Sequence, residues 1–230
     1  MTSLQEKLDF VRRRIAQQCA AVGRDPHGVQ LLAVSKTFAL SAVLEAHRAG
    51  QHQFGENYIQ EGVEKITACR ARADCGDMVW HCIGPIQSNK TRLVATHFDW
   101  VHTVDRLKIA QRLSEQRPPD MAPLQICIQV NIDGGANKAG VAPADAVAFG
   151  REVAALPRLR LRGLMTIPEP AADYAGALAV HLAAKDLWDR MRAAGLDIDT
   201  LSMGMSADLE AALAAGSTMV RVGSALFGSR

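Results

Sequence analysis

Aromatic residues and net charge are both scarce in this sequence. Phe, Trp and Tyr make up 5% of the 230 residues, and 26 basic residues nearly balance 24 acidic ones, which leaves a formal net charge of +2. Proteins that bind nucleic acid usually present a basic surface with interleaved aromatic side chains. The sequence has neither feature, and we therefore expect no nucleic-acid partner.

Paired cysteines and long apolar runs are also absent. The five cysteines, at positions 19, 69, 75, 82 and 127, are odd in number and form no CxxC pair, which favours reduced thiols over a disulfide framework. No stretch approaches the roughly 18 apolar residues of a membrane span, and the N-terminus has no apolar signal core. These features predict a soluble, cytoplasmic protein.

Two common site motifs are missing as well. No GxGxxG follows the first predicted strand, which argues against a dinucleotide-binding sheet. The stretch from His97 to His102 holds two histidines, but alternation along a strand would place them on opposite faces. We therefore assign no metal ligands.

What is present is a repeated unit of a short apolar strand, a polar or glycine-bearing turn and an alanine-rich helix. The sequence predicts strands at 30–36, 51–55, 79–84, 99–103, 124–131, 160–166, 199–203 and 218–222. It predicts helices at 41–49, 57–72, 87–96, 105–116, 143–155, 172–194, 207–215 and 224–228. Eight such units favour an α/β fold, a closed parallel (β/α)8 TIM barrel, over the alternative of an open doubly wound sheet.

An additional helix precedes these units. Apolar residues recur at spacings of three and four between positions 3 and 22, at Leu4, Leu8, Val11, Ile15, Cys19 and Val22. Gly23 ends this pattern, and the arginines at 12 to 14 are expected on a solvated face. We expect segment 1–24 to pack on the barrel, so that 1–230 forms a single domain.

A single lysine ends the first barrel strand. The apolar run 31–34 leads to Ser35, Lys36 and Thr37. At a buried rim an ammonium group loses hydration, which favours the neutral amine that can attack an aldehyde. The alternative is that Lys36 simply extends to solvent from the strand end.

The end of the last strand favours an anion. Gly223 and Ser224 open a short helix after strand eight, and Ser206 follows strand seven. In barrels of this type the loops after these two strands form the usual phosphate site. The alternative is that Gly223 is only a tight turn and Ser206 only caps the helix at 207–215.

Arg221 lies two residues before Gly223 on an otherwise apolar strand. A guanidinium held there needs an acceptor, because an unpaired buried charge is costly. A ring nitrogen, a carboxylate or a phosphate would serve. A structural salt bridge to an acid such as Glu56 is equally compatible with the sequence.

Closure of the barrel would place the first and last strands side by side, so that Lys36 neighbours Gly223 and Ser224. A phosphorylated aldehyde fits both ends of such a site. Pyridoxal 5′-phosphate is the favoured candidate, with its aldehyde on Lys36 and its pyridine nitrogen facing Arg221. A Schiff-base sugar aldolase also uses a lysine and a phosphate, although its lysine more often lies on a mid-barrel strand.

Several longer motifs extend this interpretation along the chain. They are AVSKT at 33–37, FGENYIQEG at 54–62, WHCIGPIQSNK at 80–90, RLRGLMTIP at 160–168, LSMGMSADLEAAL at 201–213 and GSTMVRVGSALFG at 216–228. In these motifs the sequence resembles the pyridoxal-phosphate homeostasis protein family, whose barrel is related to the N-terminal domain of alanine racemase. The resemblance implies cofactor-binding roles for Lys36, Asn57, His81, Ile83, Ser206, Arg221, Gly223 and Ser224.

The same resemblance implies an intracellular protein of vitamin B6 homeostasis. It would hold pyridoxal 5′-phosphate as a Schiff base on Lys36 and buffer or deliver it, with no catalytic residue. Apo-enzymes that need the cofactor would be recipients, and the protein is expected to be a monomer. The competing hypothesis is a small amino-acid racemase with Lys36 as one base and His81, Cys82 or Tyr58 as the other. The chain ends soon after the last strand, and we expect no second domain to supply such a base.

Overall fold

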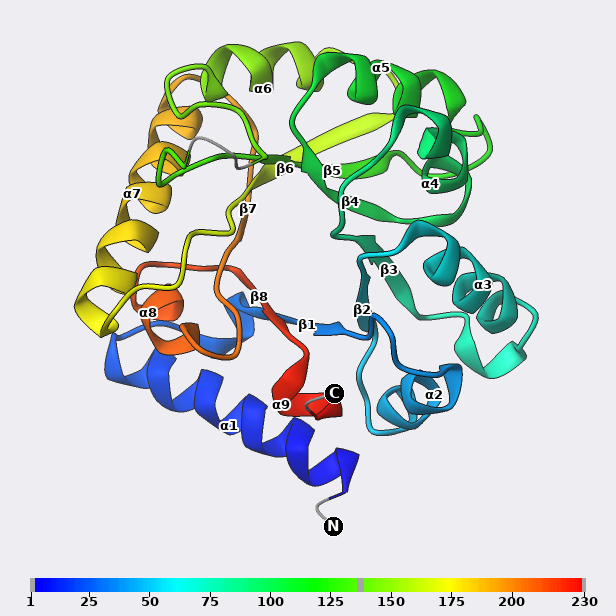
Figure 1. Ribbon diagram of the computed structural model, residues 1–230, viewed down its shortest axis with the longest axis horizontal. Coiled ribbons are helices and arrows are strands. Elements are labelled where there is room, and N and C mark those ends of the chain that lie inside the picture. Colours follow the sequence, from blue (N-terminus) through cyan, green and yellow to red (C-terminus); the bar gives the residue numbers. More distant parts are fainter. Residues whose placement is uncertain (1–2, 136–138, 229–230) are drawn as a thin grey trace.

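The computed structural model describes residues 3–135 and 139–228. Within them, eight parallel strands form one closed barrel in sequence order, as predicted (Figure 1). The strands are β1 (Gln30–Val34), β2 (Gln53–Glu56), β3 (Val79–Cys82), β4 (Trp100–Val104), β5 (Leu124–Gln129), β6 (Leu159–Met165), β7 (Thr200–Ser202) and β8 (Met219–Val222). Each predicted strand is confirmed, with ends within two residues of the expected positions.

Helices surround the barrel on its outside (Figure 1). They are α1 (Leu4–Ala21), α2 (Leu40–Arg48), α3 (Ile59–Arg70), α4 (Thr91–His97), α5 (Leu107–Gln116), α6 (Ala146–Ala154), α7 (Tyr174–Ala193), α8 (Leu209–Ala214) and α9 (Ser224–Phe227). Short 3-10 turns lie at Pro26–Gly28, Ala73–Cys75 and Ser88–Lys90. None of these helices combines the length and hydropathy that a bilayer crossing requires.

Glycine ends several helices. Gly50, Gly195 and Gly216 follow α2, α7 and α8 with φ values of 79°, 89° and 104°. This left-handed conformation carries no steric cost for glycine, which explains why the helices stop there.

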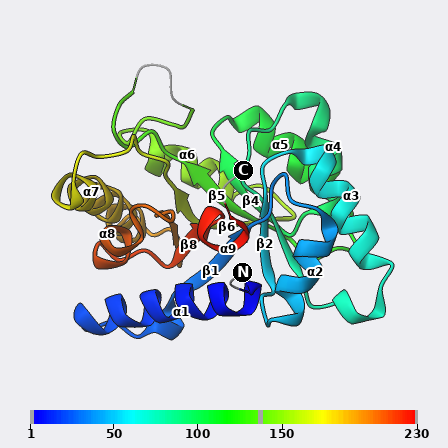
Figure 2. The same cartoon turned by 60° about the horizontal axis from the view of Figure 1, so that its bottom comes forward.

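The first helix packs against the ring rather than joining it. Leu8, Val11 and Cys19 on α1 are fully buried, and α1 contacts α8, α9 and α2 (Figure 2). Two expectations for this segment hold only in part, and Arg13 is exposed as expected. Val22 is exposed because the helix ends at Ala21. Of the arginines at 12 to 14, Arg14 pairs with Glu210 at 2.7 Å and so joins α1 to α8.

The main apolar core lies between the strands and the surrounding helices, while the barrel interior holds smaller clusters. One interior cluster joins Leu32 and Val34 of β1 to Ile83 and Met219. Side chains alternate along a strand, so the neighbours of Leu32 and Val34 point outward to the helices. The same alternation decides which residues beyond the strand ends reach the mouth.

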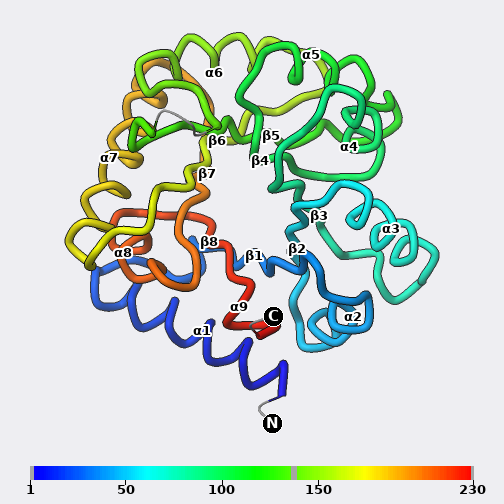
Figure 3. The backbone as a smooth tube through the Cα atoms, viewed as in Figure 1, coloured from blue at the N-terminus to red at the C-terminus, as the bar shows by residue number. Residues whose placement is uncertain are grey.

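Closure brings the two ends of the chain together. The chain passes once around the ring, so that β8 lies beside β1 (Figure 3). In this pairing Leu32 lies opposite Arg221 and Ala33 opposite Val222. The residues that follow β1 therefore lie next to the residues that follow β8.

Candidate functional site

A cavity of about 570 Å³ opens at the carboxyl end of the strands. Seven of the eight residues predicted to bind a cofactor line it: Lys36, Asn57, Ile83, Ser206, Arg221, Gly223 and Ser224. They come from the ends of β1, β2, β3, β7 and β8. Ligand sites in this fold lie at this face, and the volume is in the range of small-molecule pockets.

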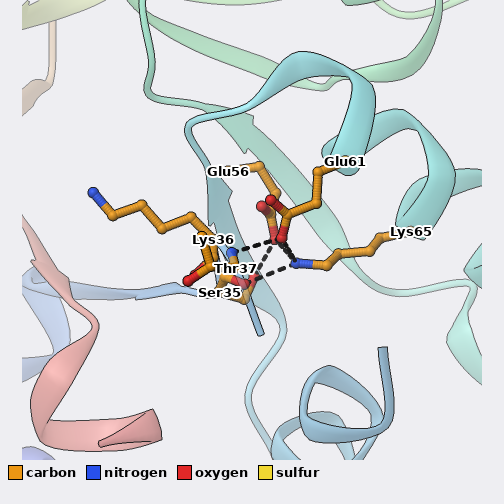
Figure 4. Close-up of polar contacts among 6 residues, drawn as sticks. All are labelled: Ser35, Lys36, Thr37, Glu56, Glu61 and Lys65. Atoms are coloured by element: carbon orange, nitrogen blue, oxygen red, sulfur yellow. Dashed lines mark hydrogen bonds and ion pairs between the residues drawn. The ribbon is translucent and has the colours of Figure 1, made fainter. Parts of the chain in front are cut away.

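Lys36 reaches the cavity because it lies in phase with Leu32 and Val34, which point into the barrel. It is half-buried rather than fully buried. Among the described residues, its amino group has no hydrogen-bond or ion-pair partner, and Figure 4 shows it extended away from the neighbouring polar side chains. The amine is therefore available to a ligand.

Arg221 is 4% exposed and held from the side away from the cavity. Its guanidinium donates to the carbonyl and hydroxyl of Ser202 and to the carbonyl of Thr166, each at 2.8 Å. Arginine has five N–H donors, so two are left for a ligand. The alternative salt bridge to Glu56 is wrong, because Glu56 pairs with Lys65 at 2.8 Å. Burial lowers the pKa of Arg221 to about 10, so the group is a cation at neutral pH.

His81 does not line the cavity, and its predicted place beside the cofactor is corrected. It is fully buried inside the barrel, where Nδ1 lies 2.9 Å from Nε2 of His102 and Nε2 lies 2.6 Å from Gln53. Nδ1 of His102 lies 3.0 Å from the hydroxyl of Ser202. His81 is therefore linked through His102 to Ser202, the residue that accepts a hydrogen bond from Arg221.

The direction of these hydrogen bonds follows from Gln53, whose Oε1 can only accept, so Nε2 of His81 donates to it. A neutral His81 then accepts at Nδ1 from Nε2 of His102, and a neutral His102 accepts at Nδ1 from the hydroxyl of Ser202. Ser202 can still accept from Arg221, which only donates. Both imidazoles are neutral in this arrangement. Burial lowers the pKa of His81 to about 3, and burial, with the nearby His81 and Arg221, lowers the pKa of His102 well below its ordinary value.

Two hydroxyls meet at the end of the cavity beyond β8. Ser224 donates to the hydroxyl of Ser206 at 3.3 Å. Ser206 is not the N-cap that the alternative interpretation required, because α8 begins at Leu209 with Asp208 before it. At Gly223 a Cβ would lie 3.2 Å from the carbonyl oxygen of Val34, so glycine permits the close approach of the two strand ends.

Asn57 and Thr166 provide unused polar atoms beside the cavity. Oδ1 of Asn57 and Oγ1 of Thr166 are buried, and neither has a hydrogen-bond partner among the described residues. Buried polar atoms usually have a partner. Because Asn57 lines the cavity, its unpaired oxygen indicates a polar ligand.

Sequence reasoning missed several lining residues. They are Val34, Ile167, Met205, Ala207 and Gly228, and Phe38 also lines the cavity. Val34 could have been predicted, because side chains two residues apart on a strand point to the same side and Val34 is two residues before Lys36. Phe38 stacks on Phe227 with ring centroids 5.1 Å apart, and nothing local in the sequence predicts that contact across the barrel closure.

A separate polar cluster lies away from this mouth. His47, His52 and Asp77 form the one group of possible metal ligands found among the described residues, and the carboxylate contacts both rings at 2.7 and 2.9 Å. His52 and Asp77 precede β2 and β3, so they lie toward the opposite end of the barrel. They take no part in the cavity.

Similar proteins agree with the geometry. The family described as alanine racemase, N-terminal domain, matches residues 7–230. A pyridoxal phosphate homeostasis protein of Pseudomonas aeruginosa is 54% identical over all of this chain and 97% of its own length. That of Escherichia coli is 50% identical over all of this chain and 98% of its own length.

The chain belongs to the pyridoxal phosphate homeostasis protein family. A solved member, PipY of Synechococcus elongatus with PLP bound, is 37% identical with a TM-score of 0.80, covering 93% of this chain and 100% of that one. The resemblance predicted from the motifs is thus confirmed.

The relation of this family to alanine racemase is one of fold. Alanine racemase of Clostridium difficile has a TM-score of 0.73 at 16% identity, and the match covers 95% of this chain but 56% of the racemase. At that identity the likeness shows a shared barrel and nothing about shared chemistry.

Proposed function

We propose that this chain binds pyridoxal 5′-phosphate in the cavity at the carboxyl end of its barrel and serves in vitamin B6 homeostasis as a carrier. The observation that supports this most directly is the amino group of Lys36, which has no partner among the described residues and lies in the same cavity as Arg221 and the Ser206–Ser224 pair. The Pseudomonas aeruginosa relative is named for pyridoxal phosphate homeostasis, and PipY binds PLP in its solved structure.

The residues present fit this cofactor. Lys36 offers an amine for its aldehyde, Ser206 and Ser224 offer hydroxyl donors for its phosphate, and the two spare N–H groups of Arg221 suit its ring nitrogen. The unpaired oxygen of Asn57 suits a further polar substituent. Ile83 provides an apolar wall, and Gly223 lets β8 approach β1 closely.

Pyridoxal phosphate, when bound, supplies an aldehyde that condenses with a neutral primary amine to give a C=N bond and one molecule of water. For this reaction Lys36 must first release the ammonium proton to solvent. Arg221 remains a cation and can only donate, so it keeps any ring nitrogen that faces it unprotonated. An unprotonated ring withdraws electrons weakly, which favours holding the cofactor over carbanion chemistry.

The absence of catalysis is part of this proposal. Lys36 and Arg221 are the only titratable side chains among the described residues that line the cavity. Of the second bases considered for a racemase, Cys82 is fully buried and burial raises its pKa to about 12, while His81 lies behind Arg221. Tyr58 is 54% exposed and does not line the cavity.

The first experiment is a visible absorption spectrum of the purified protein with PLP, before and after borohydride reduction, alongside Lys36→Ala. We expect an absorption band of attached cofactor that borohydride abolishes, and a reduced pyridoxyl group on the peptide containing Lys36. Lys108→Ala is the matched control, because Lys108 is exposed on α5 and does not line the cavity. Attachment that persists unchanged in Lys36→Ala would contradict the proposal.

The racemase alternative has its own test. The loaded protein is incubated with each enantiomer of several amino acids in deuterated water, and the α-proton signal is followed by NMR. We expect no exchange above the rate of free PLP. Rapid exchange with loss of optical rotation would show an enzyme.

The recipients and the oligomeric state belong to the proposal as well. A carrier hands the cofactor to apo-enzymes, and we propose a monomer that exposes the cavity mouth to them. Mixing loaded protein with an apo-enzyme and following the gain of its activity, against the same amount of free PLP, tests the transfer.

A further inference from the structure

A buried ion cluster lies directly behind the turn that carries Lys36. We call it the Lys65 cluster: Ser35, Glu56, Glu61 and Lys65 (Figure 4). Nζ of Lys65 donates to the carbonyl of Ser35 at 2.8 Å, to Glu56 at 2.8 Å and to Glu61 at 2.7 Å. Ser35 adds a hydrogen bond from its hydroxyl to Glu56 at 2.6 Å.

Alternation along β1 separates the two lysines. Lys36 points into the cavity, as Val34 does. Ser35, which lies between Val34 and Lys36, points outward to α3 and contacts Lys65 and Glu56. Figure 4 shows the two amino groups on opposite sides of the turn. Lys65 has three acceptors and is 6% exposed, so it is not available to a ligand.

The Ser35–Phe38 turn contains a residue in an unfavourable backbone conformation. Phe38 N–H donates to the carbonyl of Ser35 at 3.1 Å, which closes the turn, and Thr37 within it has a φ of 66°. A β-branched residue rarely adopts a positive φ, because its side chain crowds the backbone in that conformation. The surroundings must therefore hold it.

Glu61 is the residue that holds it. Its Oε1 accepts the backbone N–H of Thr37 at 2.6 Å and the amino group of Lys65 at 2.7 Å. Lys65 in turn fixes the carbonyl of Ser35, so both ends of the Lys36 peptide segment are tied to α3. Burial raises the pKa of Glu56, and the hydrogen bonds from Lys65 and Ser35 oppose that rise.

We propose that Glu61, acting directly on the N–H of Thr37 and through Lys65 on the carbonyl of Ser35, is a positioning residue that holds the strained Ser35–Phe38 turn so that Lys36 meets the aldehyde of the cofactor. This inference rests on the proposed function and deepens it. Glu61 touches neither the cavity nor the reacting atoms and adds no atoms to the condensation. Its effect is on the placement of the amine, and misplacing a reacting group by about an ångström is enough to slow a reaction strongly.

The test measures attachment and binding separately. The rate of attachment to Lys36 is measured by stopped-flow absorbance with PLP and verified by borohydride trapping and peptide mass. Affinity for the rest of the site is measured with 4′-deoxypyridoxine 5′-phosphate, which has the ring and phosphate but no aldehyde. For Glu61→Ala we expect attachment about tenfold slower and an analogue dissociation constant within about twofold of the unaltered chain.

Two further variants distinguish positioning from simple destabilisation. Glu61→Gln keeps an oxygen that can accept from Thr37, so its rate should stay within about threefold of the unaltered chain. Thr37→Gly removes the steric cost of the positive φ, so the double variant Thr37→Gly with Glu61→Ala should recover most of the lost rate. Glu64→Ala, an exposed acid on the same helix, is the matched control and should change nothing.

Two results for the Glu61 variants would overturn the positioning role. An unchanged attachment rate in Glu61→Ala overturns the inference, as does an equal loss of analogue binding that Thr37→Gly does not restore, since that pattern belongs to a residue that only supports folding. If the unaltered chain itself shows no product at Lys36, the proposed function fails and the positioning role fails with it, whereas attachment in the unaltered chain with an unchanged rate in Glu61→Ala overturns the positioning role alone.

Discussion

Two lysines lie near the turn after β1, and their hydrogen-bond partners decide which amino group is available to an aldehyde. Lys36 and Lys65 both lie near the end of β1. Lys65 contacts two carboxylates and a carbonyl, whereas Lys36 has no such partner in the part of the chain that the structure describes. The sequence marks Lys36 by its place at a strand end. The structure adds the reason that the second amine does not compete for an aldehyde.

A prediction at the phosphate end concerns Ser224. Ser224→Ala removes a hydroxyl donor next to Ser206, and a hydrogen bond to a charged group contributes about 1.5–3 kcal/mol, with less expected at an exposed residue. We expect the dissociation constant for PLP to rise about tenfold. Affinity for pyridoxal, which lacks the phosphate, should not change. Titration calorimetry with both compounds measures the difference, and an equal loss for both would place the phosphate elsewhere.

His81 gives a pH dependence of stability whose sign follows from its burial. In the folded protein it takes up a proton only near pH 3, whereas an unfolded histidine does so near pH 6.5. Between these values the unfolded state binds more protons. The free energy of unfolding therefore falls as the pH is lowered through this window.

His81→Gln removes that contribution. Between pH 7 and pH 5 a histidine of this kind loses about 2 kcal/mol of stabilisation. We expect the variant to show a correspondingly smaller drop in unfolding free energy over this range, whatever its stability at pH 7. Urea denaturation at the two pH values gives the comparison, with the exposed His27→Gln as control. An unchanged drop in His81→Gln would mean that His81 is not held neutral.

At the scale of elements, the loops after β2 and β3 lie against each other. Gly84 has no room for a side chain, because a Cβ there would collide with the carbonyl oxygen of Asn57. Thr103 on β4 also donates to the Gly84 carbonyl at 2.7 Å. The position of Asn57 at the mouth thus depends on a glycine 27 residues later in the chain.

Gly84→Ala tests this dependence. The backbone of one loop must shift, and we expect a loss of about 2–3 kcal/mol in unfolding free energy together with weaker PLP binding. Gly76→Ala is the control, since a Cβ there meets nothing within 4 Å and its φ of −67° suits alanine. Its stability should stay within about 0.5 kcal/mol of the unaltered chain. Equal behaviour of the two variants would show that the loops do not constrain each other.

At the scale of the whole molecule, the cavity is a product of closure. Its walls come from the ends of six strands, and Lys36 lies near Gly223 and Ser224 only because β8 pairs with β1. A ligand that contacts all of them binds the folded state alone. Its binding energy therefore adds to the stability of the barrel.

This linkage gives a prediction for the unmodified chain. At a concentration 100 times the dissociation constant, 4′-deoxypyridoxine 5′-phosphate should raise the free energy of unfolding by about 2.7 kcal/mol. The analogue is chosen because it cannot react with lysines of the unfolded chain. Urea denaturation with and without it provides the measurement, and inorganic phosphate at the same concentration is the control. No stabilisation would mean that the cavity does not bind the ring and phosphate together.

The sequence alone determined the order and approximate limits of the strands and helices, because strand and helix periodicities and glycine caps are local properties. It also identified Lys36 and Arg221, since a charged residue that ends an apolar strand is conspicuous without any structure. Only the tertiary structure decided that Arg221 is held by Ser202 rather than by Glu56, and that His81 supports it from behind. It likewise decided that Glu61 fastens the turn of Lys36. Hydrogen bonds between residues far apart in the chain depend on how the barrel closes, and no local pattern records them.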